Sequence, residues 1–291
     1  MKIVWEDMVA NNYVIRKMSR AEVDLVIDWA ATEGWNPGLN DANSFYTADP
    51  NGFLVGLLDG VPIATISAIK YGDSFGFIGF YIVKPEYRGK GYGIKIWNAA
   101  MEYLHGRNIG LDGVVSQQGN YQKSGFKLAY RNIRYCGVGG GDFHSDSVIV
   151  DLSKVPFNDL YNYDKQFFPD DRIKFLMSWI SQPKITAIGA LNSDGKLIGY
   201  GVVRECRAGY KIGPQFSDTP EIAENLFLTL KSNTPKGSPI FLDIPEVNLE
   251  AMELVKRYNM KMVFETARMY TGKIPALPIN KIFGVTTFEL G

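Results

Sequence analysis

Apolar residues in the first half of the chain follow two alternating periods, one typical of strands and one typical of helices. Ser19 and Glu22 form an S-x-x-E capping box, and the apolar residues that follow recur at helical spacing. Asp59-Gly60 separates two apolar runs and is a strong hairpin signal. The pattern predicts strands at 13–18, 53–58, 61–70, 75–83, 111–116 and 126–135, with helices after 19, after 93 and before 126. This order predicts an α/β fold with a mixed sheet and helices on its faces.

The second half of the chain partly repeats the first after a glycine-rich segment, Gly137–Asp142. We therefore predict one domain at 1–137, a linker at 138–146 and a second domain at 147–291. In the second domain we expect strands at 147–152, 185–191, 196–205, 210–216, 240–244, 260–270 and 282–288, and helices at 156–165, 170–180, 220–230 and 249–258.

Composition narrows the classes of protein that the chain can belong to. The 291 residues have a formal net charge of +0, and 46% of them are hydrophobic. A balanced charge argues against a general nucleic-acid binder or a binder of acidic membranes, because both need a basic face. The two cysteines, Cys136 and Cys206, form no metal or disulfide pattern. No uninterrupted apolar span is long enough to cross a membrane, and the N-terminus has no signal-peptide pattern. We therefore expect a cytoplasmic protein, either a monomer or a homodimer.

The segment from Phe75 to Gly93 carries the most specific chemistry. A buried strand is followed by Arg88-Gly89-Lys90-Gly91-Tyr92-Gly93 and then by a helix whose Ile94, Trp97, Met101 and Leu104 are expected to face a core. Free amides at a helix N-terminus and the helix dipole both favour a phosphate group, and glycines let it approach the backbone. The alternative is an ordinary glycine-rich surface turn.

Two motifs in this order resemble the GNAT superfamily of acyl-CoA-dependent N-acetyltransferases. The first is Arg88-x-x-Gly91-x-Gly93, between a strand and a helix, and the second is the Y-x-K-x-G-F motif at 121–126. The resemblance is strong over roughly residues 13–135 and weaker beyond them. It implies acetyl-CoA as a cosubstrate, with the pyrophosphate held by the amides of the loop, from Arg88, Gly89, Lys90, Gly91, Tyr92 and Gly93.

The resemblance also implies roles for three further residues. Ile82 and Val83, at the end of the preceding strand, are expected to pair with the pantetheine arm. Tyr121 is expected to protonate the departing thiolate, and a phenol with an ordinary pKa near 10 is still protonated at neutral pH. The alternative for Tyr121 is an aromatic plug that only packs at a helix start.

The second domain departs from the family at its equivalent of the phosphate loop. The segment from Ile212 to Glu221 lacks R-x-x-G-x-G, and it places Asp218 and Glu221 at a helix start, where acidic groups occupy the amides and repel a pyrophosphate. We therefore expect the second domain not to bind CoA. It would shape the substrate cleft or take the place of a dimer partner, and the alternative is a purely stabilising unit.

The acceptor site is expected around the segment E-G-W-N-P-G at 33–38, which resembles a segment of GNAT proteins that carry a second, C-terminal GNAT-like half. Trp35 offers a flat apolar wall, with Asn36 beside it. Glu33, Asp41 and Asp73 are candidates for the base that takes the amine's proton, and a chain of waters is the alternative. Arg268 is expected either to bind a substrate carboxylate or phosphate, or to pair with an acid of the protein.

The sequence thus predicts an N-acetyltransferase that moves an acyl group from acetyl-CoA to a primary amine on a small molecule, by direct attack in a ternary complex. Two alternatives stay open. One is acetylation of protein lysines or N-termini, and the other is a non-catalytic acyl-CoA sensor. Tyr121 favours chemistry, because binding CoA alone needs no proton donor at that position.

Overall fold

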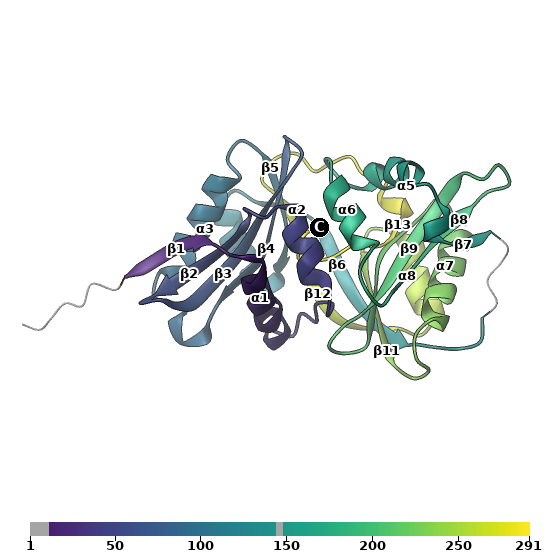
Figure 1. Ribbon diagram of the computed structural model, residues 1–291, viewed down its shortest axis with the longest axis horizontal. Helices are drawn as coiled ribbons and strands as arrows, with labels where there is room; N and C mark the ends of the chain where they lie inside the picture. The colour runs from purple at the N-terminus through teal and green to yellow at the C-terminus, as the bar shows by residue number, and fades with distance from the viewer. Residues whose placement is uncertain (1–11, 144–147) are drawn as a thin grey trace, which may run out of the picture.

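The computed structural model describes residues 12–143 and 148–291, and Figure 1 shows two lobes whose strands meet in the middle of the molecule. The first half contains, in order, β1 (Tyr13–Lys17), α1 (Arg20–Thr32), α2 (Asp41–Ala48), β2 (Phe53–Leu58), β3 (Val61–Tyr71), β4 (Phe75–Val83), α3 (Tyr92–Tyr103), β5 (Asn108–Val114), α4 (Gln118–Lys123) and β6 (Lys127–Val138). The second half contains β7 (Ile149–Asp151), α5 (Phe157–Asp164), α6 (Ile173–Trp179), β8 (Ile185–Leu191), β9 (Leu197–Glu205), β10 (Tyr210–Ser217), α7 (Pro220–Ser232), β11 (Pro239–Pro245), α8 (Leu249–Arg257), β12 (Lys261–Tyr270) and β13 (Ile282–Gly284). The expected mixed α/β architecture is confirmed.

The two halves exchange strands within one continuous sheet. The strand order is β1-β2-β3-β4-β5-β12-β6-β11-β10-β9-β8-β7, and β13 pairs with β10. Strand β12, from the second half, pairs with β5 of the first half, and β6, from the first half, pairs with β11 of the second. Strands β6 and β12 also pair with each other over most of their length. Each half therefore completes its part of the sheet with a strand from the other.

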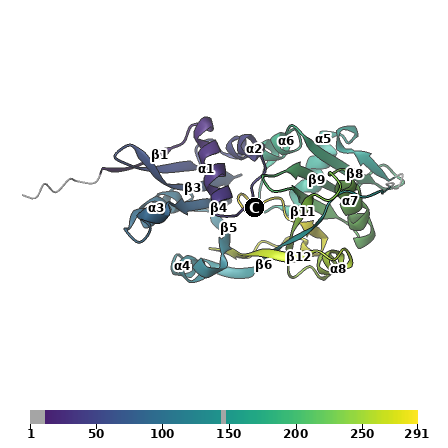
Figure 2. The same cartoon turned by 90° about the horizontal axis from the view of Figure 1, so that it is seen from below.

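Helices cover both faces of this sheet (Figure 2). On one face, a single core joins apolar residues of α1, α2, α5 and α6 and extends across both halves. On the other face there are two separate cores, one under α3 and α4 and one under α7 and α8. The continuous core and the exchanged strands hold the halves together through buried apolar surface.

Local signals in the sequence produce the expected local structure in several places. Ser19 donates its N–H to the carboxylate of Glu22 at 2.8 Å, as a capping box requires. Asp59 and Gly60 have φ values of 49° and 81°, the left-handed pair that a two-residue type I′ hairpin needs. The predicted helix at 19 and the hairpin at 53–70 are confirmed.

Other expectations differ from the structure. Ile94 is 55% exposed and Met101 is half-buried, so the apolar stripe of α3 consists of Ile96, Trp97, Ala100 and Leu104. Strand β13 ends at Gly284, and the residues after it form a buried tail rather than the rest of a strand. Helix α2 was not expected.

The predicted boundary between the domains falls where β6 of the first half pairs with β11 of the second half. Strand β6 runs through Val138, the first residue of the predicted linker, and Gly139 donates its N–H to the carbonyl of Ser238 at 2.7 Å. Residues 144–146 of the linker, and residue 147 of the predicted strand at 147–152, lie outside the described residues. The division at 138–146 stays a prediction.

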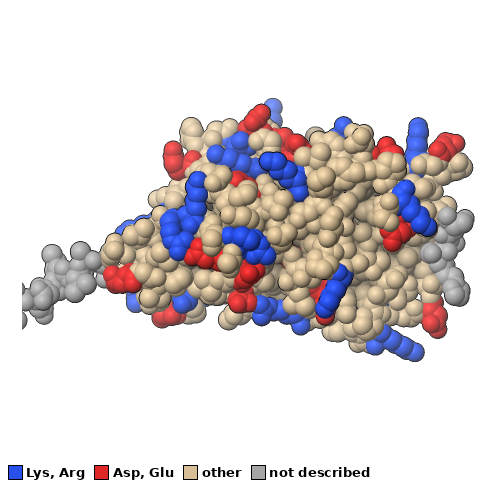
Figure 3. All heavy atoms as spheres, viewed as in Figure 1, with Lys and Arg blue, Asp and Glu red and all other residues tan. Residues whose placement is uncertain are grey.

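Within residues 12–143 and 148–291, no helix combines the length and apolar character needed to cross a bilayer. On the face that Figure 3 shows, Lys and Arg side chains lie among Asp and Glu side chains rather than in one basic patch. This face offers no concentrated positive charge to a polyanion.

Candidate active site

A cavity of about 600 Å³ opens where β4 and β5 separate. The two parallel strands are paired from Phe75 and Asn108 as far as Ile78 and Leu111, and beyond that point they diverge. A change of register against β3 occurs here, and Phe80 has a φ of 47°. Because this bulge turns β4 away from β5, the two strands stop pairing with each other, and space for a ligand opens between them.

The glycine loop forms one wall of this cavity. Gly89 and Gly91 have φ values of 76° and 83°, which favour glycine strongly. A Cβ atom on Gly93 would lie 2.5 Å from the hydroxyl oxygen of Tyr81, so any side chain there would collide with the cavity wall. Gly91 is the N-cap of α3 and has no side chain to occupy the first amides of the helix. The loop therefore places the N-terminus of α3 at the cavity, where an anion would be favoured, while the N–H of Arg88 is paired with the Pro85 carbonyl at 3.2 Å.

Six of the eight residues expected to bind the cofactor line the cavity, namely Ile82, Val83, Arg88, Gly89, Gly91 and Gly93. Two side chains do not. The ammonium of Lys90 lies 5.7 Å from the ring centroid of Tyr87, and the ring of Tyr92 packs 4.9 Å from that of Tyr13. Lys90 and Tyr92 can contribute to this loop through their backbone amides.

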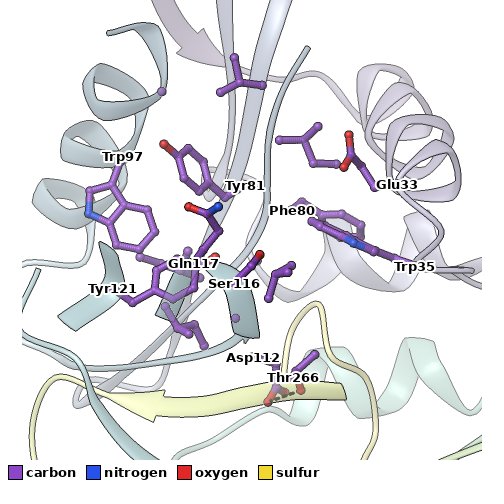
Figure 4. Close-up of a pocket in the computed structure, with 18 of the residues that line it drawn as sticks. Glu33, Trp35, Phe80, Tyr81, Trp97, Asp112, Ser116, Gln117, Tyr121 and Thr266 are labelled. Carbon is purple, nitrogen blue, oxygen red and sulfur yellow. Dashed lines mark hydrogen bonds between the residues drawn. The ribbon is translucent and has the colours of Figure 1, made fainter. Parts of the chain in front are cut away.

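Tyr121, on α4, also lines the cavity, and Figure 4 shows it beside Trp97 of α3. The two rings stack, with centroids 5.7 Å apart and planes 29° apart. Burial, together with the nearby Tyr81, raises the pKa of Tyr121 to about 12. The phenol is therefore held in its protonated form over the whole physiological range, as a proton donor requires.

Glu33 and Trp35 also line the cavity, at the end of α1. The Glu33 carboxylate accepts a hydrogen bond from the Arg88 guanidinium at 2.5 Å, and Arg88 Nε donates to the Val83 carbonyl at 2.7 Å. The Trp35 carbonyl accepts from Arg134 at 2.6 Å. Hydrogen bonds thus connect the segment at 33–38 to the glycine loop through Arg88 and to strand β6 through Arg134.

Two other residues expected in the acceptor site, Asn36 and Asp41, lie outside the cavity. Asn36 exchanges two hydrogen bonds of 3.0 Å with the backbone of Ala208, in the second half. Asp41 is fully buried and accepts from Arg204 Nε at 2.9 Å. Their positions indicate that Asn36 and Asp41 join the two halves instead of contacting a substrate.

Arg268 also lies outside the cavity and makes the pairing that the sequence left as an alternative. Its guanidinium donates to both carboxylate oxygens of Asp112, at 2.9 and 2.5 Å. Asp73, a candidate for the base, is exposed at the turn between β3 and β4 and does not line the cavity.

The floor of the cavity comes from the second half of the chain. From the sequence we expected this half to shape the cleft or to replace a dimer partner, but we did not identify these residues as lining the cavity. Strand β12 supplies Phe264 and Thr266, and the tail after β13 supplies Phe288 and Glu289. Figure 4 shows Thr266 next to Asp112 of β5, with a 3.3 Å hydrogen bond between them. These residues reach the cavity because the two halves exchange strands, and no local sequence pattern predicts that exchange.

In the second half, the segment from Ile212 to Glu221 corresponds to the glycine loop, and one of its own side chains pairs with an amide of the helix start. Thr219 caps α7 by accepting from the N–H of Ile222, which was the role expected of Asp218. Asp218 instead accepts from the Tyr163 hydroxyl and from Lys281, each at 3.1 Å. The absence of CoA binding by this half stays a prediction.

Parallel strands that separate beside a glycine loop leave room for an extended thioester, and this is the architecture of the GNAT N-acyltransferases. The model of the Acetyltransferase (GNAT) family matches residues 21–126, and the model of an Acetyltransferase (GNAT) domain matches residues 160–284. The holothin acyltransferase of Pseudoalteromonas sp. (strain SANK 73390) is 30% identical over 273 residues, which are 94% of this chain and 92% of that protein. The chain therefore belongs to the GNAT acetyltransferase family and contains two GNAT domains.

Solved structures agree on the fold. A protein from Pyrococcus horikoshii described as an acetyltransferase superposes with a TM-score of 0.82 at 24% identity, covering 98% of both chains. A tandem GNAT protein from the clavulanic acid biosynthesis pathway has a TM-score of 0.63 at 12% identity, covering 90% of this chain and 99% of its own. At these identities the likeness concerns the fold alone.

Proposed function

We propose that this protein is an N-acetyltransferase that moves the acetyl group of acetyl-CoA to a primary amine on a small molecule, by direct attack within a ternary complex. The observation that carries the proposal is the convergence of the glycine loop, the free end of β4 and the Tyr121 phenol on one cavity. Acetyl-CoA is the cosubstrate of the GNAT family, and these are the positions that its pyrophosphate, pantetheine arm and sulfur would need.

Each part of the site has one chemical task. The amides of the loop from Gly89 to Gly93 bind the pyrophosphate, since the Arg88 N–H already donates to the Pro85 carbonyl, and Ile82 and Val83 align the pantetheine arm beside the bulge at Phe80. Backbone amides at this bulge polarise the thioester carbonyl and stabilise the oxyanion that forms on attack. Tyr121 gives its proton to the sulfur as the carbon–sulfur bond breaks. Holding the amine and the thioester together removes most of the entropic barrier to their meeting.

Two observations favour a small molecule over a protein tail. The second domain supplies a floor of side chains, including Phe264 and Phe288, where a peptide would need a through-going groove. In addition, the relative that matches nearly the whole chain is named for the acylation of holothin. The second domain, in this proposal, shapes the acceptor cleft and binds no CoA of its own.

The test is a calorimetric titration of the protein with acetyl-CoA, followed by a screen of primary amines for release of free thiol. A Gly91→Asp variant places a carboxylate and a side chain in the loop, and binding should weaken at least 100-fold. Gly195→Asp is the matched control, because Gly195 also has a positive φ, of 75°, but lies in the β8–β9 turn with open space around it.

One site per chain, lost in Gly91→Asp and kept in Gly195→Asp, supports the proposal. Two sites per chain would show that the second domain also binds CoA. Binding without transfer to any amine would favour an acyl-CoA sensor, and absence of binding would refute the proposal.

A further inference from the structure

Among the described residues, three carboxylates line the cavity, and two of them are already occupied. Glu33 is held by the guanidinium of Arg88 at 2.5 Å. Asp112 accepts from Arg268, from the amide of Asn132 at 2.8 Å and from the hydroxyl of Thr266 at 3.3 Å. Neither can take a proton from a substrate without giving up a strong partner.

Glu289, the third carboxylate, differs from the other two. The residue is only 3% exposed, and its Oε2 oxygen has no hydrogen-bond partner. A buried carboxylate oxygen without a partner is costly, and such groups in native proteins usually mark a site that something else completes. Because Glu289 lines the cavity, the missing partner can come from a bound molecule.

The tail that carries Glu289 is fixed against the reactive end of β4. A Cβ atom on Gly79 would lie 1.9 Å from the Glu289 carbonyl oxygen, so the tail touches the backbone just before the bulge at Phe80. The next residue, Leu290, is anchored through its carbonyl, which accepts from the Tyr71 hydroxyl at 3.1 Å. Tail and bulge are therefore in direct contact, and the carboxylate is placed on rigid structure.

Behind Glu289 lies a buried group of charges from both halves. Arg134, Arg204 and Lys211 all lie within electrostatic range of its carboxylate. Arg134 is paired with Asp243, Lys211 donates to the carbonyl of Asn36, and Arg204 is paired with Asp41 through Nε, while Nη2 of Arg204 has no hydrogen-bond partner. The cations make a negative charge tolerable at this depth, but none of them donates a hydrogen bond to Glu289 Oε2.

We propose that Glu289 is the catalytic residue that binds the acceptor amine and takes its proton, so that the second domain supplies the base for the acetyl-CoA bound by the first. This inference rests on the proposed function. It also narrows the acceptor to a primary amine on a flat, apolar group, because the cavity lining includes four aromatic side chains, those of Trp35, Phe80, Phe264 and Phe288.

The reaction step balances with the groups present. An acceptor bound as ammonium first gives one proton to the Glu289 carboxylate, which releases it to solvent. The neutral amine nitrogen then forms a bond to the thioester carbon and passes a second proton to Glu289. The carbon–sulfur bond then breaks, and the leaving sulfur takes the proton of Tyr121. The products are the amide and free CoA thiol, and the proton on Glu289 returns to the Tyr121 phenolate through solvent after product release.

The experiment compares wild type, Glu289→Gln and Glu289→Asp with acetyl-CoA and the best aromatic primary amine from the screen. The measurements are kcat and KM between pH 6 and pH 10, the acetyl-CoA Kd by calorimetry and thermal unfolding. Glu265→Gln is the control. Glu265 is a half-buried glutamate of the second half, on β12, and it does not line the cavity.

We expect Glu289→Gln to lower kcat about 100- to 10,000-fold with an unchanged acetyl-CoA Kd, the range typical of a lost general base. Its rate should rise with pH more steeply than that of wild type, because neutral amine must then come from solution. Glu289→Asp keeps the charge near the cations but withdraws the carboxylate by one methylene, so it should unfold like wild type and still lose kcat.

Full activity of Glu289→Asp, or of a folded Glu289→Gln, would overturn the proposal and leave Glu289 as a partner for the buried cations. The proposed function would stand in that case, because wild-type transfer is measured separately. If the wild type transferred no acetyl group to any amine, both proposals would fail together.

Discussion

Asp243 and Arg134 form a buried ion pair between β11 and β6, and its removal is a sharp test of how the two halves hold together. The guanidinium donates to both carboxylate oxygens at 2.7 Å, and the two side chains are only 3% and 2% exposed. Arg134 also lies over the ring of Phe288, 4.8 Å from its centroid, and donates to the Trp35 carbonyl. One arginine thus links the exchanged strands to two residues of the cavity wall.

The expected cost of Asp243→Ala follows from this burial. The variant leaves a guanidinium without its counter-charge, and breaking one partner of a buried pair costs about 3–5 kcal/mol. For lobes of this size each kcal/mol lowers Tm by about 2–4 °C, so Tm should fall by roughly 6–20 °C. Glu253→Ala is the control, since it breaks an exposed pair with Lys256 and should change stability by less than about 1 kcal/mol.

The same pair predicts a dependence of stability on pH. Burial, the largest single cause, raises the pKa of Asp243, but Arg134, Lys211 and Arg204 together lower it by more, and the net shift is downward. A lowered pKa in the folded state means that the contribution to stability is present above the ordinary pKa of about 4 and is lost as pH falls through the folded-state pKa. Wild type should therefore lose stability more steeply than Asp243→Ala on acidification below about pH 4.

The assays are urea denaturation and thermal unfolding, together with kcat and KM for the acceptor. We expect a higher KM for the amine in Asp243→Ala, because Trp35 and Phe288 lose their support, and an unchanged acetyl-CoA Kd. An Arg134→Met, Asp243→Leu double variant should recover much of the stability, as apolar replacements of buried pairs do. A loss below about 1 kcal/mol in Asp243→Ala would refute the assignment of this pair as a buried, structural link.

Three further predictions concern the cavity. Tyr121→Phe should lower kcat by about 100- to 10,000-fold with an unchanged acetyl-CoA Kd, measured by thiol release and calorimetry, and an unchanged kcat would exclude the leaving-group role. Because burial raises the pKa of Tyr121 to about 12, the kcat profile should show no fall from its ionisation up to about pH 10, and a fall that Tyr121→Phe abolishes would contradict this. Gly113→Ala would place a Cβ atom 2.2 Å from the Tyr121 ring, so it should lower kcat and Tm together, whereas Gly119→Ala, with open space around it, should change neither kcat nor acetyl-CoA affinity.

Structural features that a few adjacent residues determine could be predicted from the sequence. The capping box at Ser19, the turn at Asp59-Gly60 and the glycine loop each depend on backbone preferences that a short window contains. Tyr121 was found through the spacing of its motif, and the structure places it on the cavity wall. The α/β class followed from the order of elements, because that order restricts how sheets and helices can pack.

Features that depend on distant partners could not be predicted. The apolar pattern of β6 and β12 is the same whichever strand lies beside them, so it cannot reveal that they exchange places. Asp41 looks like a loop carboxylate in the sequence, yet it pairs with Arg204 of β9. Glu289 was not predicted, because its place in the cavity also depends on residues distant in the sequence. A single acid within the apolar end of the chain was a usable signal.

The strand exchange has a consequence for how the protein is made on the ribosome. The glycine loop and Tyr121 are synthesised early, but β12, the neighbour of β5, begins about 150 residues later, roughly 7–30 s at typical rates of translation. Until then β5 presents an open edge, which invites pairing with a wrong strand. The nascent first half thus lacks the neighbour of β5, and the cavity floor is complete only when the tail carrying Phe288 and Glu289 has emerged.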